Sequence, residues 1–461
     1  MILISTPIDE IDFKIEEKLK KKTMQVSIAE GSFGVFSSVL ADNYIIPFSL
    51  SINSSPFQVG LLTSLGNFAS PIGQLISSNQ IEVKSRKNLI ISGILGQACM
   101  WPLFLAIALL YQFGLIQSYL SWILIVIFLI YMLFAGIMTP PWFSVMGDVV
   151  PENYRGRYFA KRNLITNLTA IIGIILLSFF LDWFKAHEIL YFGFTLIFIF
   201  GLVTRLISAF LYTKHYYPPF IFKATDHVKI SQFIRELPRS NFGKFTLFVS
   251  LLTLGQWIAK PFFAVYMLTQ LKFEYSLFMI INLSSSLIGL ITFPLLGRFS
   301  DKFGNARLLR MGAIIIPLLP FFWIIYNTPL QIFLGIQILS GIAWTAFNLA
   351  ASNFIYDNIP SEKRGKYIAI YNSLLGLAII SGGLLGGTFA SFIPIFFMNS
   401  YHFIFLLSGI VRITVVILLV AKIKEIRVST KPILNIKNLS VYKWLYDLTL
   451  RSNIQRKKNR N

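Results

Sequence analysis

The chain has 461 residues, of which 55% are hydrophobic and only 13% are charged, and its mean hydropathy is +0.67. A soluble domain carries charges at about a quarter of its positions, so this composition excludes an ordinary soluble protein and predicts an integral membrane protein. The net charge of +21 would fit a nucleic-acid partner, and the placement of the basic residues along the chain has to decide that question.

Apolar runs long enough to cross a bilayer as helices recur along the whole sequence, since a hydrocarbon core of about 30 Å requires about 20 residues. The predicted spans are 29–51, 57–78, 89–111, 120–147, 163–182, 189–213, 245–269, 275–297, 308–326, 330–356, 367–394 and 402–422. The predicted fold class is therefore an all-α integral membrane protein with twelve transmembrane helices. The first 28 residues are polar and lack the apolar core of a signal peptide, so insertion is expected to start at the first span.

Lysine and arginine gather on one side of this predicted membrane topology. Of the 41 basic residues, only Lys185 and Lys272 fall on the other side, and Arg205, Lys260 and Arg412 fall within spans. This is the positive-inside bias of a multi-pass protein, and it predicts that both termini lie in the cytoplasm. The membrane in question is expected to be the plasma membrane. The charge is explained by topology, so no nucleic-acid partner is expected.

The chain contains an internal repeat of six plus six spans, an arrangement common among transporters. The stretch "DVVPENYRGRYFAKRN" (148–163) matches "DNIPSEKRGKYIAIYN" (357–372) at an offset of 209 residues, and 78–90 matches 297–309 at an offset of 219. The predicted domains are a cytoplasmic N-terminal segment (1–28), a first six-helix bundle (29–213), a central cytoplasmic loop (214–244), a second bundle (245–422) and a basic cytoplasmic tail (423–461). The tail is either an interfacial helix on anionic lipid or a solvated segment.

The loop "GRFSDKFGNAR", which begins at Gly297, closely resembles the signature of the major facilitator superfamily: Gly, three residues, Asp, a basic residue, one residue, Gly, then basic residues. The resemblance covers nearly the whole chain, because the spans, the central loop and both repeated loops stand where that family has them. It implies two pseudo-symmetric six-helix bundles and secondary transport of a small organic solute by alternating access, with or without coupling to an ion or a proton. We also expect a monomer that is not an enzyme and carries no cofactor or metal.

In the family this loop locks the cytoplasmic gate, which implies that Asp301 and its first-half counterpart Glu82 hold an outward-open state. Gly297 is expected to let two helix ends approach closely, and Gly304 to permit a turn that a Cβ would strain. Asp301 is expected to accept hydrogen bonds at a helix start. The alternative is that these charges only set topology. The remaining residues of the predicted gate are Lys302, Arg307, Arg86, Lys87, Asp148, Arg155, Asp357 and Arg364.

The last four of these belong to the repeated loops after the fourth and tenth spans. Asp148 with Arg155, and Asp357 with Arg364, are expected to form the matching network on the cytoplasmic face. A purely structural role as helix caps is the alternative for both acids.

Ionisable residues inside the membrane are functional candidates, because they cost about 3 kcal/mol or more at mid-span. Asp42 lies about 18 Å along a helix from Glu30, near the midplane, and the repeat brings Lys260 to the equivalent place in the second half. The family resemblance implies that both helices line the central cavity. Our hypothesis is that Asp42 and Lys260 pair in the empty cavity and exchange that pairing for a substrate or a proton; a static pair that only fastens the halves is the alternative.

Polar and aromatic residues on the cavity-type helices complete a predicted pocket. They are Asn43, Tyr44, Trp142, Asn163, Asn167, Gln256, Trp257, Trp344, Asn348 and Asn372. Each one taken singly fits packing or interhelical hydrogen bonding as well as it fits ligand contact. Arg205 and Arg412, in the sixth and twelfth spans, are expected to have structural or snorkelling roles.

Two other classes of function compete with transport. A membrane enzyme would need a cluster of His, Cys or acidic residues, but the four histidines are scattered without metal spacing, and no phosphate-binding loop is present. A non-transporting sensor or partner-binding protein is the main alternative. Within transport, a facilitator and a drug efflux permease both stay open, although the fifth span lacks the Gly-rich proline signature of family antiporters and the fourth lacks an intramembrane Arg.

Overall fold

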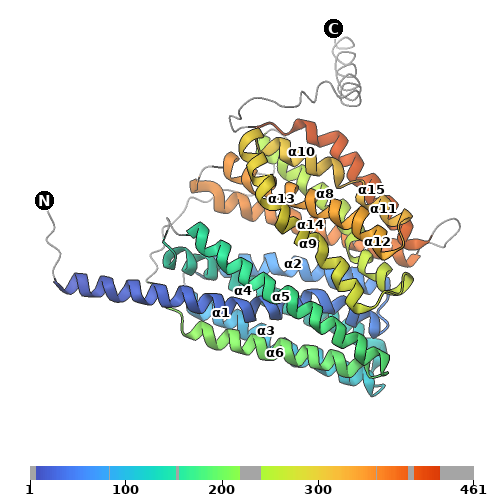
Figure 1. The fold of residues 1–461 in the computed structure, drawn as a ribbon, viewed down its shortest axis with the longest axis horizontal. Helices are drawn as coiled ribbons and strands as arrows, with labels where there is room; N and C mark the ends of the chain where they lie inside the picture. Colours follow the sequence, from blue (N-terminus) through green and yellow to red (C-terminus); the bar gives the residue numbers. More distant parts are fainter. Residues whose placement is uncertain are drawn as a thin grey trace, which may run out of the picture.

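The structure is a computed structural model that describes residues 7–81, 84–151, 155–218, 240–359, 361–392 and 399–425. Helices and short connections make up all of these residues, with no strand among them, and the predicted all-α fold is confirmed (Figure 1). The predicted central loop and the helix or solvated segment expected in the tail fall largely on residues 219–239 and 426–461, outside the described residues.

The described helices follow the predicted spans in both halves. The first half consists of α1 (Pro7–Ser51), α2 (Pro56–Gln80), α3 (Arg86–Gln112), α4 (Gln117–Val149), α5 (Arg155–Ala186) and α6 (Leu190–Thr213). The second half consists of α8 (Asn241–Val265) extended by the π turn η1 (Tyr266–Gln270), α9 (Tyr275–Phe303), α10 (Asn305–Ile315) with α11 (Leu319–Ile325), α12 (Pro329–Gln331) with η2 (Ile332–Gln337) and α13 (Ile338–Asn358), α14 (Ser361–Phe392), and α15 (Ser400–Leu419) with η3 (Val420–Lys422).

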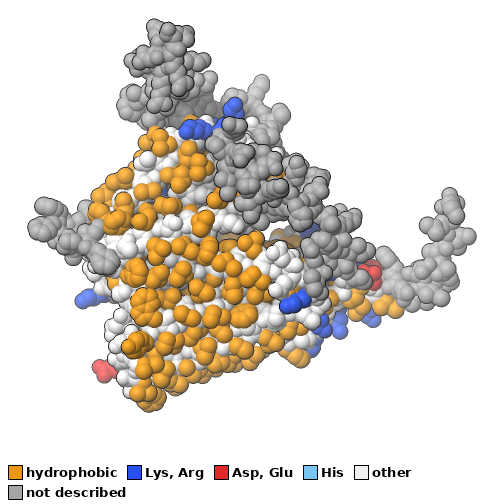
Figure 2. Space-filling view, turned by 180° about the vertical axis from the view of Figure 1, so that it is seen from behind, with side chains coloured by type: hydrophobic (Ala, Val, Ile, Leu, Met, Phe, Trp, Pro, Cys, Tyr) orange, Lys and Arg blue, Asp and Glu red, His pale blue; other side chains and the backbone are white. Residues whose placement is uncertain are grey.

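Eleven of the predicted spans coincide with helices of the described chain that are long and apolar enough to cross a membrane. The twelfth is α2, which has 25 residues but is rich in Gly, Ser, Asn and Gln. Its small and polar residues face other helices, since α2 lies against α4, α8 and α14. Figure 2 shows a molecular face covered largely by hydrophobic side chains, with Lys and Arg at its margins, as a lipid-facing surface requires.

Helix α1 is longer than the span predicted for it. It begins at Pro7 and passes without a break through the predicted boundary at residue 29, so its 45 residues extend for about 70 Å. Residues 15–22 are largely exposed and rich in charge, and the pairs Glu16 with Lys20 (2.8 Å) and Glu17 with Lys21 (2.7 Å), each four residues apart, support the helix. The predicted span began at residue 29 because the apolar run begins there. The helix starts earlier, because these ion pairs and contacts farther along the chain stabilise its polar first part.

The two halves form two bundles that meet along α2 with α14 and α5 with α9 (Figure 1). We call the side where α2 and α9 end the basic face, and the side where they begin the opposite face. Near the opposite face α2 and α14 touch through glycines: a Cβ built on Gly383 would collide with the Cβ of Ser64, so only Gly allows this approach. Toward the basic face the same helices border a hollow of about 140 Å³.

The second joint between the halves also lies at the opposite face. The carboxylate of Asp182, near the end of α5, accepts hydrogen bonds from the backbone amides of Tyr275 (2.7 Å) and Ser276 (2.8 Å), the first residues of α9. A negative charge at a helix N-terminus satisfies unpaired amides and is favoured by the helix dipole. In this conformation the halves are therefore fastened to each other at the opposite face.

Candidate substrate cavity

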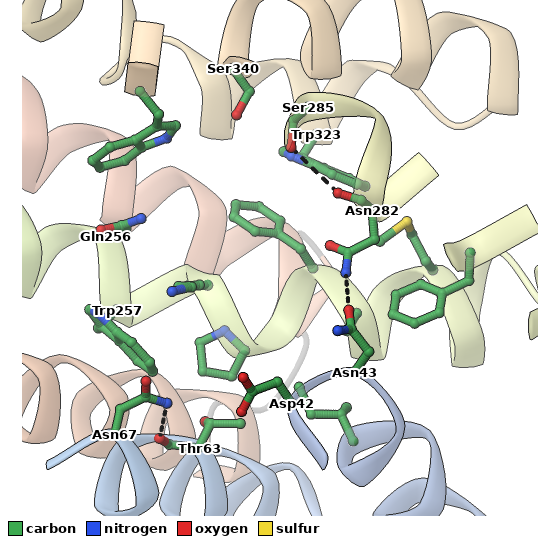
Figure 3. A pocket seen from close by; sticks show the side chains of 18 of the residues that line it. Asp42, Asn43, Thr63, Asn67, Gln256, Trp257, Asn282, Ser285, Trp323 and Ser340 are labelled. Atoms are coloured by element: carbon green, nitrogen blue, oxygen red, sulfur yellow. Dashed lines mark hydrogen bonds between the residues drawn. The ribbon is translucent and has the colours of Figure 1, made fainter. Parts of the chain in front are cut away.

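A cavity of about 490 Å³ lies between the two bundles, and side chains of both halves line it (Figure 3). The predicted candidates Asp42, Asn43, Gln256, Trp257, Lys260 and Trp344 all line this cavity. The first two come from α1, the next three from α8 and the last from α13. The structure thus brings six of the predicted pocket residues together around one space.

Asp42 and Lys260 both expose their side chains to this cavity. They make no direct ion pair in this conformation, among the pairs that the described residues form. The Lys260 ammonium instead lies 4.4 Å from the centre of the Trp257 ring, where the π electrons attract a cation. The predicted pair therefore makes no direct contact here, although the two charges attract each other across the cavity and both side chains are open to a ligand.

Proline breaks the backbone hydrogen bonding beside each of these charges. Pro47 in α1 and Pro261 in α8 lack an amide hydrogen, so the carbonyls of Asn43 and Trp257, four residues earlier, have no helical donor. Each half thus places a polar carbonyl next to its ionisable side chain at the cavity.

Four other predicted candidates lie outside the cavity lining. The Tyr44 hydroxyl points away and donates to the Ile174 carbonyl of α5 at 2.6 Å. Trp142 packs against the guanidinium of Arg162, at 4.6 Å. Asn348 is exposed one helical turn beyond Trp344 on the same side of α13, and Asn372 borders the small hollow near the basic face. For Tyr44 and Trp142, buried polar partners in the first half determine the direction of the side chain.

Asn163 and Asn167 on α5 are also exposed and do not line the cavity. The sequence did not determine which face of α5 they occupy, because polar and apolar residues are mixed around this helix without a helical period.

Several cavity residues were not singled out from the sequence. Asn282 of α9 donates to the Asn43 side chain at 3.3 Å and so connects the two halves across the cavity (Figure 3). Asn67 of α2 donates to the Thr63 carbonyl at 2.9 Å, and Trp323 of α11 stacks on Phe263 with ring centres 4.8 Å apart. No local motif marks these residues. Only the internal repeat, in which α9 is the counterpart of α2, could have directed attention to α9.

Arg412 lies in the cavity wall although it was expected to have a peripheral role. It is 2% exposed, and its guanidinium donates to the backbone carbonyls of Ile316 (3.3 Å) and Gln256 (3.4 Å). Its first-half counterpart Arg205 lies away from the cavity. Arg205 donates to the side chain of Gln97 and to the Gly34 carbonyl.

A buried ionic cluster fills the first half toward the basic face. Glu30 lies 3.6 Å from the guanidinium of Arg162 and accepts from the Ser208 hydroxyl at 3.1 Å. Arg162 also donates to the carbonyl and hydroxyl of Ser27, both at 3.2 Å. From the sequence, Glu30 served only as a landmark and Arg162 counted among the loop charges, because their contact joins residues far apart in the chain.

The predicted gate residues of the first half are partly brought together. Arg86 is buried and donates to Asp148 at 2.5 Å, to Ser144 at 3.0 Å and to the Pro218 carbonyl at 2.6 Å. The expected partner of Asp148 was Arg155, which instead donates to the Gly147 carbonyl at 2.9 Å. That expectation was wrong because Arg155 begins a new helix that carries its side chain back toward the end of α4.

The other two first-half gate candidates are less constrained. Lys87 is exposed, with its ammonium 5.8 Å from the centre of the Tyr217 ring. Glu82 lies outside the described residues.

The signature loop of the second half makes its contacts within its own half. Gly304 has φ +91°, a conformation that favours glycine, and a Cβ there would collide with the carboxylate of Glu425. The start of α10 is capped by Glu425, which accepts from the Ala306 amide at 2.6 Å, so the acid at this helix N-terminus is not Asp301 as expected. Gly297 has no atom within 4 Å of the place where its Cβ would be, so the close helix approach expected there is absent.

The remaining gate candidates surround this loop. Asp357 accepts from the Asn305 side chain at 2.6 Å, and its expected contact with Arg364 stays a prediction. Asp301 and Lys302 are exposed at the end of α9, and Arg307 is half-buried in the first turn of α10. The side chain of Arg364 is not among those described.

An all-helical membrane protein whose two bundles enclose a polar central cavity is the architecture of a solute carrier. The sequence matches the family model described as the Major Facilitator Superfamily over residues 31–324 and again over 245–438. The chain belongs to this superfamily, and the resemblance noted in the signature loop is confirmed.

Similar structures share the fold at low sequence identity. A mutant of the nucleoside transporter NupG superposes with a TM-score of 0.67 at 12% identity, over 87% of this chain and 100% of the other. A bacterial homologue of the iron transporter ferroportin, in an inward-facing state, gives 0.66 at 14% identity over 88% and 99% of the two chains. A POT family transporter in complex with a thioalcohol-conjugated peptide gives 0.66 at 13% identity, over 88% and 97%.

Multidrug resistance protein 3 of Bacillus subtilis (strain 168) is 29% identical over 115 residues. This match covers 25% of the present chain and 21% of that relative. It is a partial match, and it leaves most of both chains unaligned.

Proposed function

We propose that the protein is a secondary transporter that moves a small organic solute across the plasma membrane by alternating access. The observation that carries this proposal is the cavity of about 490 Å³ enclosed by both halves, with charged, polar and aromatic side chains on its walls. A site at the interface of two repeats can be exposed to either side when one bundle rocks against the other. The cavity volume is within the range of small-molecule sites.

The two contacts between the halves indicate on which side of the membrane the cavity is closed. The positive-inside bias assigns the basic face and both termini to the cytoplasm, so the glycine contact of Gly383 and the Asp182 cap lie on the outer side. With both joints formed, this conformation is closed toward the outside. The outward-facing state then requires release of the α9 start from Asp182.

Asp42 and Lys260 are the proposed coupling residues, because both face the cavity and neither is neutralised by a direct partner. Asp42→Asn and Lys260→Ala are each expected to reduce transport while the protein still folds. Normal transport in both variants would remove these residues from the mechanism and favour a cavity that works without them.

The main alternative is a sensor that has the fold but does not expose the cavity alternately. Labelling distinguishes the two. In a Cys99→Ser background, Asn43→Cys places a thiol in the cavity, and a membrane-impermeant reagent is applied to right-side-out and inverted vesicles. We expect faster labelling from the cytoplasmic side, and a rise in labelling from the outside when Asp182→Asn loosens the outer joint. A thiol reached from one side only, in both backgrounds, would contradict alternating access.

Drug efflux is a second candidate within transport, favoured by the partial match to a multidrug resistance protein and by the tryptophans of the cavity. The cavity carries two cations and one acid, which is unusual for a site that takes cationic drugs. We therefore place efflux of cationic compounds below transport of a charged metabolite. We further infer a monomer without enzymatic activity or cofactor.

A further inference from the structure

Arg412 is a buried cation without a matching anion. Its guanidinium donates only to two backbone carbonyls, at 3.3 and 3.4 Å, and no acidic side chain among the described residues pairs with it. The side chain is 2% exposed and forms part of the cavity wall. A buried charge that is incompletely paired is costly, so its position at a cavity requires an explanation.

The equivalent arginine of the first half shows what Arg412 lacks. Arg205 donates to the Gln97 side chain, and the charge of the buried acid Glu30 acts on it within the same cluster. At the offset of 219 residues these two partners correspond to Ile316 and Val249, which provide no acceptor side chain. The second half has therefore kept the cation and lost both groups that would satisfy it.

Lys260 also lines the cavity and belongs to α8, the helix to which Arg412 donates. The carbonyl of Gln256, which accepts from Arg412, belongs to the helical turn that ends at Lys260, because helical bonds join residues four apart. The Lys260 side chain points into the cavity and rests on Trp257. Both cations thus line the same cavity, and Asp42 is the one acid among the described residues that line it.

We propose that Lys260 and Arg412 form an anion subsite that receives the carboxylate or phosphate group of the transported solute. The planar guanidinium offers paired donors to such a group, and Lys260 adds a mobile ammonium. The neighbouring rings of Trp257 and Trp323 provide flat walls for an unsaturated or cyclic part of the same molecule. This inference rests on the proposed function and names the substrate class for it, an organic anion.

The test is a matched set of ligands on one ring scaffold: phenylacetate, phenyl phosphate, L-phenylalanine, phenethyl alcohol and phenethylamine. Thermal stability of the purified protein is measured against each ligand up to about 10 mM, because a ligand of the folded state raises the melting temperature. We expect phenylacetate or phenyl phosphate to stabilise the protein most and phenethylamine least; which of the two is stronger separates a carboxylate from a phosphate substrate. Equal shifts for all five, a preference for the amine, or no shift with either anion would overturn the proposal.

Variants then assign the effect to the two cations. Arg412→Gln and Lys260→Gln are each expected to weaken the anion's apparent affinity at least roughly tenfold, whereas Arg412→Lys keeps most of it. The matched control is Lys214→Gln, which removes an exposed cation outside the cavity. Lys260 faces open space, so its variant is expected to fold even if Arg412→Gln does not. Unchanged anion affinity in Lys260→Gln would show that the subsite is wrong.

The outcomes for the subsite and for transport are distinguishable. Anion binding that depends on Lys260, combined with one-sided labelling of Asn43→Cys, would keep the subsite and refute the transporter. Two-sided labelling without any preference for anions would keep the transporter and refute the subsite.

Discussion

At the basic face, the interiors of the two halves are filled differently on the same helical framework. The first half buries Glu30, Arg162 and Arg205 as an ionic cluster. In the second half, the offsets of the repeat place Val249 and Tyr371 where Glu30 and Arg162 would be, and Tyr371 stacks on Phe245 with ring centres 5.9 Å apart. One half is held together there by charges and the other by aromatic packing.

The repeated loops show the same divergence in a milder form. Arg86, Ser144 and Asp148 of the first half correspond, by the offsets of 219 and 209 residues, to Asn305, Asn353 and Asp357. Both sets are hydrogen-bonded in the same order, with an ion pair in the first half and amide bonds in the second. The repeat therefore preserves the geometry of this network and exchanges its chemistry.

The largest expected effect comes from replacing the buried acid of the first half. Glu30→Val introduces the second half's residue and leaves Arg162 and Arg205 without their anion, which we expect to cost about 3 to 5 kcal/mol of stability. The measurement is the melting temperature in detergent, with Glu17→Val, an exposed acid on the same helix, as control. A melting temperature equal to that of the control would mean that the cluster does not hold the first half together.

Breaking the first-half loop network is expected to have the next largest effect. Arg86→Ala removes bonds to Asp148, Ser144 and the Pro218 carbonyl, and should cost about 2 to 3 kcal/mol because the arginine is buried. Arg86→Asn, which imitates the second half, should recover part of this loss. The view that the second half keeps the geometry of this network would be contradicted if Arg86→Asn were less stable than Arg86→Ala in the same thermal assay.

A pH dependence is expected from the first half. Burial, and in second place Arg162, lower the pKa of His215 to about 4, below the value of about 6.5 in an unfolded chain. The neutral form is therefore favoured in the fold, and its stabilising contribution is complete above about pH 6.5 and lost as pH falls toward 4. Between pH 7 and pH 5 we expect a loss of about 2 kcal/mol.

His215→Gln is the control for this effect, since glutamine keeps a polar side chain but does not titrate. Melting temperatures recorded across the same pH range should fall less steeply in the variant. Parallel curves for the two proteins would assign the acid sensitivity to other groups.

The smallest expected effect lies in the second half. Tyr371→Phe keeps the ring that stacks on Phe245 and removes only a hydroxyl, so we expect a change within about 0.5 kcal/mol. Thermal unfolding of the variant measures it, and a loss comparable to that of Glu30→Val would show that the second half also relies on a polar contact at this place.

The sequence was sufficient for the parts of the molecule that depend on local pattern. Apolar length predicted the helices, and intramembrane charge directed attention to Asp42 and Lys260, which the cavity brings together. It failed where a contact joins distant residues: Asp182 meets the start of α9 across 93 residues, and no local motif indicates that bond. Arg86 with Asp148 was missed for a different reason, because the sequence offered Arg155 as a nearer partner.

Some of the missed information was present in the repeat. The offsets that aligned Asp148 with Asp357 also align Arg205 with Arg412 to within a few residues, and they show Ile316 and Val249 in place of two polar groups. Once the structure shows that Gln97 and Glu30 accompany Arg205, a comparison of the halves for lost partners singles out Arg412.

The glycine contact between α2 and α14 has a consequence for the speed of opening. Where Gly383 meets Ser64, the helices touch through backbone and a short side chain, and on either side of this point the rings of Phe57 and Phe68 lie against glycines of α14. Separating such smooth surfaces requires few rotamer changes and releases little buried side-chain area. The energy barrier to separating α2 from α14 should therefore be low. The rate of each cycle should depend instead on breaking the hydrogen bonds between Asp182 of α5 and the start of α9.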